Sequence, residues 1–207
     1  MQKGLVSIIT PCYNTGSIVH RLLDSILEQD YPSVEMFAID DGSTDNTPDV
    51  IKSYIAKFEK KGYRLTYVKQ ENGGQSSAIN NGLKMVSGEY LAWPDSDDFY
   101  CVPTALSSLV ITLNENKEVA VARALPINVS DVSLQLISKR KITDETMNGE
   151  QFENCLYSNH MIWPPVSYMI RMEAFEKVNP LREIYVEKNA GQNWQMLLPI
   201  LYEYKCK

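Results

Sequence analysis

The stretch Val34-Glu-Met-Phe-Ala-Ile-Asp40, continued by Asp41-Gly-Ser-Thr-Asp45 and Thr47-Pro48, decides the fold. Its apolar run through Phe37, Ala38 and Ile39 predicts a buried strand. Threonine suits the cap of a helix and proline its first position, so Thr47-Pro48 predicts a helix start. A strand, a polar turn and a helix therefore follow one another directly.

The same alternation of strand and helix extends to both sides of this stretch. Short β-branched or aromatic runs predict strands at residues 6–10, 34–40, 65–68 and 90–93. Apolar residues at helical spacing predict helices that begin near residues 18, 47, 76 and 103. Four such repeats predict an α/β fold, with a mostly parallel twisted sheet and helices on both faces.

The second half of the chain is less regular. Strands are expected at residues 119–124 and 166–170, and helices at 172–178 and 192–202, the last interrupted by Pro199. Residues 128–160 have weak periodicity and predict no element. We expect one domain with a Rossmann-like half, 1–113, and a second half, 114–207. The chain stops at Lys207 without a turn signal, which suggests truncation.

Composition excludes several classes of protein. A hydrophobic share of 44% and a charged share of 22% are typical of a globular chain. The net charge of -6 argues against nucleic acid as a partner. Four scattered cysteines form neither a zinc set nor a disulfide framework. No apolar run is long enough for a leader or a membrane span, so we expect a cytoplasmic protein with reduced thiols.

The strongest chemical signal is Asp95-Ser-Asp-Asp98, which follows the fourth predicted strand. Ligands of parallel sheets bind beyond the carboxyl ends of the strands. Three adjacent carboxylates repel one another unless a cation compensates them, and Asp95 and Asp97 can face one site. Mg²⁺ typically takes one or two carboxylates together with substrate phosphates. The alternative is a solvated acidic turn that caps the next helix.

The other strand ends are also polar or aromatic. Asp41, in the turn after the second strand, can accept hydrogen bonds from a base or a ribose, and Tyr13 can stack on a base. The alternatives are an ordinary Asx-rich turn and a half-buried tyrosine. The Asn72-Gly-Gly turn follows the third strand, but neither a dinucleotide fingerprint nor a P-loop lysine motif is present.

Taken together and in order, these pieces resemble the family 2 glycosyltransferases with the GT-A fold. The resemblance covers about the first 110 residues and is carried by five segments, at residues 6–14, 25–29, 39–45, 72–82 and 88–98. It implies a usually inverting transferase that uses Mn²⁺ or Mg²⁺ and moves a sugar from a nucleotide diphosphate sugar to a glycan or lipid-linked acceptor. It also implies that residues 1–113 bind the donor and residues 114–207 the acceptor.

The resemblance assigns roles residue by residue. Pro11, Tyr13 and Asp41 would hold the nucleotide base, Asp95 would lie near the ribose, and Asp97 would bind the catalytic metal. Asn14 and Asn80 match the family's motifs and are assigned to the nucleotide as well, although Ile79 replaces the arginine often found before Asn80.

The proton acceptor is left open. The family usually has an acidic pair at the start of a late helix, where this chain has Gln192-Asn193. Amides are not bases at neutral pH. Either Glu187 supplies the carboxylate, or the matching stretch lies elsewhere, or this subgroup arranges its acceptor differently. Glu187 can equally be a surface residue. Gln192, Asn193 and Trp194 are expected to bind the acceptor sugar, although Trp194 can instead pack in the core.

Three functions follow from these residues. The first is a glycosyltransferase of polysaccharide or cell-envelope glycan synthesis, cytoplasmic and with a peripheral association with the inner face of the membrane left open. The second is a catalytically silent protein that binds nucleotide sugars without a general base. The third, an aspartyl phosphohydrolase, needs an Asp-x-Asp-x-Thr order that neither acidic segment supplies.

Overall fold

The fold is built on one seven-stranded sheet of order β3-β2-β1-β4-β8-β5-β9. It comes from a computed structural model that describes every residue except 131–132, 140–142, 145, 147–149 and 188–190. The strands are β1 Gln2–Cys12, β2 Val34–Asp40, β3 Arg64–Lys69, β4 Gly88–Ala92, β5 Val119–Arg123, β8 Tyr168–Arg171 and β9 Lys205–Cys206. A separate hairpin pairs β6 Ile127–Val129 with β7 Leu136–Lys139.

The parallel half of the sheet is centred on β1, which lies between β2 and β4. Its pairing with β2 runs in unbroken register from Val6↔Val34 to Cys12↔Asp40. On the other side β8 is antiparallel to both β4 and β5. The predicted α/β fold with a mostly parallel sheet is therefore confirmed, with one reversed strand inside it.

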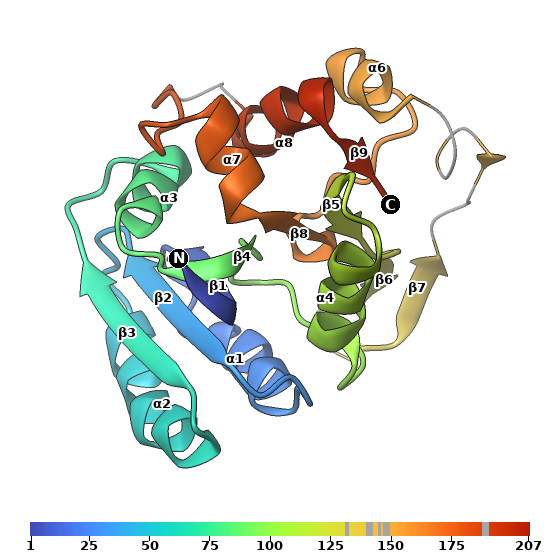
Figure 1. The fold of residues 1–207 in the computed structure, drawn as a ribbon. Helices are drawn as coiled ribbons and strands as arrows, with labels where there is room; N and C mark the ends of the chain where they lie inside the picture. The colour runs from blue at the N-terminus through green and yellow to red at the C-terminus, as the bar shows by residue number, and fades with distance from the viewer. Residues whose placement is uncertain (131–132, 140–142, 145, 147–149, 188–190) are drawn as a thin grey trace.

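Helices cover both faces of the sheet, as predicted (Figure 1). One apolar cluster joins β1 and β2 to α1 Val19–Leu27, α2 Thr47–Lys61 and α4 Ala105–Glu115. A second cluster on the opposite face joins α3 Gln75–Leu83, α6 Gln151–Leu156, α7 Met172–Val178 and α8 Gln192–Glu203. None of the helices in the described part of the chain combines the length and apolar character that crossing a bilayer requires.

The structure corrects one prediction in the second half and adds elements to it. Helix α8 continues through Pro199, which we expected to interrupt it. The proline costs one main-chain hydrogen bond, but Met196, Leu197 and Ile200 on the same helix are fully buried and hold it against the sheet. The β6–β7 hairpin, α6 and β9 were not predicted, because their short segments carry too few apolar positions to set a period.

A buried carboxylate joins three strands and the residue before β4 at the amino end of the sheet. Glu35, with 2% of its side chain exposed, accepts hydrogen bonds from Ser7 Oγ at 2.6 Å and from Ser87 N at 2.7 Å and Oγ at 2.9 Å. It also accepts one from the guanidinium of Arg64. Burial raises the pKa of Glu35, but the bonds from Ser7, Ser87 and Arg64 outweigh it, so the pKa lies below its usual value.

We expect Glu35→Gln to lower the free energy of unfolding by about 2 kcal/mol at neutral pH, because the amide nitrogen cannot accept these bonds. The pKa of Glu35 is depressed in the folded state, so its stabilisation is complete above the ordinary glutamate pKa and is lost as the pH falls through the folded value. Urea unfolding across the acidic range should show the difference between the two proteins shrink. Glu28→Gln, at an exposed position, is the control; an equal loss there would contradict the assignment.

Candidate functional site

Two adjoining cavities lie at the carboxyl edge of the parallel strands. The smaller cavity, of about 500 Å³, is lined by the residues that follow β1, β2 and β4. The larger cavity, of about 1010 Å³, lies between the start of α3 and the start of α8. They share four residues, Asn72, Gly74, Gln75 and Asp95. The sheet edge therefore offers two neighbouring chambers with a common wall.

The smaller cavity brings together five of the residues predicted from the sequence. Pro11, Tyr13, Asp41, Asp95 and Asp97 all line it. Tyr13 is 52% exposed, so its ring is available to a ligand. The strand-end argument explains this convergence, since parallel strands place their carboxyl ends along one edge of the sheet.

Asp41 is fully engaged within the protein. Its carboxylate accepts hydrogen bonds from the main-chain amides of Gly73 and Gly74, each at 2.8 Å, and from Gln70 Nε2 at 2.7 Å. Its main-chain carbonyl accepts a further bond from Asn72 Nδ2 at 2.9 Å. Asp41 is thus the group that shapes the 72–74 turn, which forms one wall of both cavities.

The 72–74 turn depends on glycine where it enters α3. Gly74 has φ of +84°, a left-handed conformation that side chains rarely adopt, and the next residue, Gln75, starts the helix. The turn therefore depends both on the hydrogen bonds from its main-chain amides to Asp41 and on a glycine at position 74.

In the acidic cluster at residues 95–98, burial and mutual repulsion disfavour the charged form of the carboxylates. Burial raises the pKa of Asp95 to about 7, repulsion from Asp98 and Asp97 adds to it, and hydrogen bonds from Gln192 and Gln75 partly oppose it. Burial, followed by repulsion from Asp97, raises the pKa of Asp98 to about 6. Carboxylates held this close gain from a nearby positive charge.

The residues at the smaller cavity fit a divalent cation that substrate oxygens complete. Asp95 and Asp97 both line this cavity, and the repulsion at Asp95 is the kind of imbalance that a cation relieves. Across the described residues, however, no three His, Cys, Asp or Glu side chains are grouped to hold a metal by themselves. Two carboxylates suit Mg²⁺ or Mn²⁺ only when phosphate oxygens and water supply the other ligands.

Two residues assigned to the nucleotide line neither cavity. Asn80 is 5% exposed, and its amide is paired with the main chain of Ile184 through two bonds of 2.8 Å. Asn14 Oδ1 accepts a bond from Thr44 N at 2.8 Å and so ties the end of β1 to the turn after β2. Their side chains brace the site rather than line it, and we do not carry them into the proposed nucleotide contacts.

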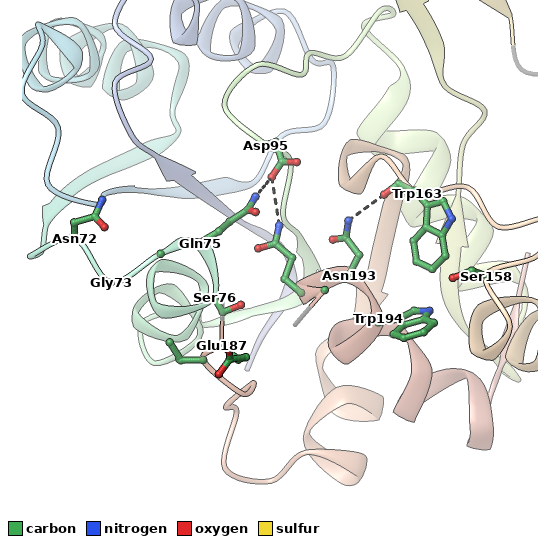
Figure 2. Close-up of a pocket in the computed structure, with 14 residues that line it drawn as sticks. Asn72, Gly73, Gln75, Ser76, Asp95, Ser158, Trp163, Glu187, Asn193 and Trp194 are labelled. Carbon is green, nitrogen blue, oxygen red and sulfur yellow. Dashed lines mark hydrogen bonds between the residues drawn. The ribbon is translucent and has the colours of Figure 1, made fainter. Parts of the chain in front are cut away.

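The start of α8 borders the larger cavity with Gln192, Asn193 and Trp194. Asn193 is engaged on both sides, since it accepts a bond from Trp93 Nε1 at 2.9 Å and donates one to the carbonyl of Trp163 at 3.0 Å. Figure 2 shows the second of these bonds. Asn193 therefore fixes the helix start to the end of β4.

Glu187 lines the larger cavity and is exposed. The segment before it is clamped at two points. Ile184 is paired with Asn80, as described above, and Tyr185 exchanges two main-chain bonds with the amide of Gln195, at 2.6 and 3.1 Å. These contacts hold the main chain just before Glu187, which lines the cavity together with Ser76 (Figure 2).

Several residues that border the site were not predicted. Gln75, Ser158 and Trp163 line the larger cavity, and Gln70 holds Asp41. Gln75 directly follows the glycine turn, a position that could have singled it out. Ser158 lies in the weakly periodic segment 128–160 and Trp163 follows it closely, so the sequence alone offered no element on which to place either residue.

Comparisons with known proteins agree on one family. The family model described as "Glycosyl transferase family 2" matches residues 7–178. The uncharacterized glycosyltransferase EpsJ of Bacillus subtilis is 32% identical over 181 residues, which is 86% of this chain and 51% of that protein. Glycosyltransferase GlyA of Streptococcus pneumoniae is 38% identical over 94 residues, 45% of this chain and 13% of that protein. The chain thus spans about half, or less, of the length of these relatives.

Solved structures establish the same fold. The mannosyltransferase PcManGT from Pyrobaculum calidifontis, in complex with GDP-Man and Mn²⁺, superposes with a TM-score of 0.71 at 20% identity, covering 100% of this chain and 55% of that one. S. aureus TarS residues 1–349, in complex with UDP-GlcNAc, gives 0.67 at 21% identity, covering 96% and 53%. The expected GT-A fold is therefore confirmed.

The hydrogen bonds of Asp41 lead to a prediction about the turn that divides the two cavities. Asp41→Asn removes one carboxylate oxygen, so one of the glycine amides loses its acceptor, and stability should fall by about 1–3 kcal/mol. Amide hydrogen exchange should speed up most at Gly73 and Gly74. Asp49→Asn, at an exposed position in α2, serves as the control. Unchanged exchange at the two glycines would show that Asp41 does not hold the turn.

Proposed function

The chain belongs to glycosyl transferase family 2, and from this premise we propose that it transfers a sugar from a nucleotide diphosphate sugar to a hydroxyl of a glycan or lipid-linked acceptor, with inversion. The observation that carries the proposal is the shared wall of the two cavities. Asp95 and Asp97 line the smaller cavity beside Tyr13, and Asp95 also lines the larger cavity, across which Glu187 lies.

In this proposal the smaller cavity takes the nucleotide. The exposed ring of Tyr13 stacks on the base, with Pro11 beside it, and Asp95 lies nearest the ribose. Asp41 contributes by holding the 72–74 turn that closes this cavity. The structurally similar PcManGT and TarS are in complex with GDP-Man and UDP-GlcNAc, respectively, which supports a nucleotide sugar as the donor class.

The diphosphate lies at the acidic cluster, with Asp97 and Asp95 as the residues that would hold Mn²⁺ or Mg²⁺. When bound, such a cation neutralises the charge that develops on the departing nucleoside diphosphate. Asp97 is exposed and free to turn towards it, whereas the two glutamine amides fix Asp95. These two carboxylates therefore orient the leaving group without being consumed.

The acceptor enters the larger cavity, so donor binding falls to residues 1–113 and acceptor binding mainly to residues 114–207. Glu187 takes the proton from the acceptor hydroxyl as that oxygen attacks the anomeric carbon. Apart from Asp95, it is the one carboxylate among the described residues that line this cavity. A base on the face opposite to the leaving diphosphate supports a single displacement with inversion.

A second function is favoured by Gln192 and Asn193. These amides stand where the resemblance places an acidic pair, and neither can accept a proton at neutral pH. Without a base, the chain would bind a nucleotide sugar and not turn it over. The two proposals thus share one donor site and differ in the role of Glu187.

The biological setting is part of the same proposal. We place the reaction in polysaccharide or cell-envelope glycan synthesis, in the cytoplasm and at the inner face of the membrane. A lipid-linked acceptor requires only that the protein reach the membrane surface. Fractionation of cells that express the tagged protein tests this setting directly.

The first test removes the proposed metal ligand. Asp97→Ala should abolish the Mn²⁺-dependent part of nucleoside diphosphate binding, because it removes the exposed carboxylate proposed to bind the cation together with the phosphate oxygens. Calorimetric titration of UDP, GDP and dTDP sugars, with and without Mn²⁺, measures it. Asp30→Ala, at an exposed position outside the site, should bind like the parent. Unchanged affinity in the Asp97 variant would count against the assignment.

The second test separates the two functions. Glu187→Gln should lower turnover by about 10²–10⁴-fold, the usual range for a general base, and leave donor affinity unchanged. Release of nucleoside diphosphate from a panel of nucleotide sugars with Mn²⁺ reports turnover. Glu183→Gln, an exposed change on the same segment, is the matched control. Donor binding by the parent protein without any turnover would establish the silent binder instead.

A further inference from the structure

An amide–carboxylate–amide cluster lies where the two cavities meet. Gln75 Nε2 donates to Asp95 Oδ1 at 2.5 Å, and Gln192 Nε2 donates to the same oxygen at 3.4 Å (Figure 2). Gln75 is the first residue of α3 and Gln192 the first of α8. Asp95 is thus held by the first residues of two helices, and all three side chains line the larger cavity.

One atom of this cluster has no partner. Gln192 is 7% exposed, and its Oε1 is buried without a hydrogen bond from any described residue. A buried carbonyl oxygen left in this state costs free energy that a bound O–H or N–H group recovers. Because Gln192 lines the larger cavity, a hydrogen-bond donor bound there beside Asp95 would recover this cost.

The negative charge of the larger cavity disfavours an anionic ligand. Its described lining holds two carboxylates, Asp95 and Glu187, and no lysine, arginine or histidine. A ligand with its own carboxylate in this cavity would face these two like charges, and no side chain among the described lining residues offers it a positive charge. Hydroxyl groups instead find acceptors in Asp95, Glu187 and Gln192 Oε1.

The far end of the cavity is aromatic. Trp163 and Trp194 pack edge to face, with ring centroids 6.3 Å apart at an interplanar angle of 64°. Trp194 is 39% exposed. Both rings lie with Ser158 at the end of the cavity away from Asn72 and Gly73 (Figure 2). An indole face suits the C–H surface of an uncharged pyranose ring.

We infer that the larger cavity selects an uncharged sugar and rejects a uronic acid, and that Gln192, supported by Gln75, recognises a hydroxyl group of that sugar. This inference rests on the proposed function, because it takes the transferred sugar of the donor to enter this cavity past Asp95. Gln192 thereby becomes a specificity-determining residue for the donor sugar, in addition to its expected place beside the acceptor.

The first experiment compares donors that share a nucleotide and differ only at carbon 6 of the sugar. UDP-glucose is paired with UDP-glucuronate and GDP-mannose with GDP-mannuronate, titrated calorimetrically into the full chain with Mn²⁺. In any pair that binds, the neutral member should bind at least about tenfold more tightly, because juxtaposed like charges are costly. Equal or tighter binding of the uronate would overturn the inference.

The second experiment tests the residue. Gln192→Met keeps the length of the side chain and removes its hydrogen-bonding groups, so affinity for the preferred neutral nucleotide sugar should fall by about tenfold. Affinity for the nucleoside diphosphate alone should stay within about twofold, since that part of the donor lies in the smaller cavity. Gln75→Met, at an exposed position, should weaken sugar binding in the same direction even if the buried variant fails to fold.

Gln2→Met, an exposed change at the start of β1, is the matched control and should bind as the parent does. A Gln192 variant that loses the diphosphate and the sugar donor equally would show a structural role and overturn the inference. Failure of the folded parent to bind any donor or nucleoside diphosphate would overturn the proposed function itself. If the parent binds the nucleoside diphosphate but does not prefer the neutral sugar donor over the uronate, only the inference is overturned.

Discussion

The parallel pairing of β1 with β2 and β4 is the constraint on which the site depends. Because β1 and β2 stay in register up to Cys12↔Asp40, Tyr13 and Asp41 emerge at the same level of the sheet. Asp95 follows β4 on the other side of β1. A slip of one residue in either pairing would turn these side chains to the opposite face of the sheet. The register of these strands thus determines which side chains meet at the ligand site.

Hydrogen bonds convert this alignment into two shaped cavities. The carboxylate of Asp41 accepts hydrogen bonds from the 72–74 turn, which forms the wall between the two cavities. Asn193 fixes the start of α8 to the end of β4 through Trp93. The side chains available to a ligand are those that are exposed, chiefly Tyr13 and Asp97. Two aspartates at the same site therefore differ in role, because Asp41 is bonded within the protein and Asp97 is exposed.

The sequence predicted the first half well because the signals there are local. The bounds of β2 follow from one apolar run, and Pro48 marks the first turn of α2, although the N-cap is Asn46 and not Thr47 as predicted. The meeting of Tyr13, Asp41 and Asp95 followed from strand-end logic alone. The second half was harder, because β6 and β7 are short strands that pair only with each other and β9 is a two-residue strand that pairs with the distant β5. No local period records such contacts.

Residue roles were less predictable than residue positions. Asp41 and Asn80 both sit in motif segments, yet their hydrogen bonds lie within the protein, to a turn and to the main chain of Ile184. Such partners depend on how side chains pack across the fold, which spacing along the chain does not encode. Family resemblance fixed where the acidic cluster lies, and the structure revealed that Gln75 and Gln192 converge on it.

The most direct measurement is a crystal structure of the chain with Mn²⁺ and a nucleoside diphosphate, read through the anomalous signal of manganese. A single strong peak should appear within bonding distance of Asp97, with the pyrophosphate beside it and the base against Tyr13. A peak elsewhere, with Asp95 and Asp97 turned to bulk water and the nucleotide outside the smaller cavity, would contradict the central claim.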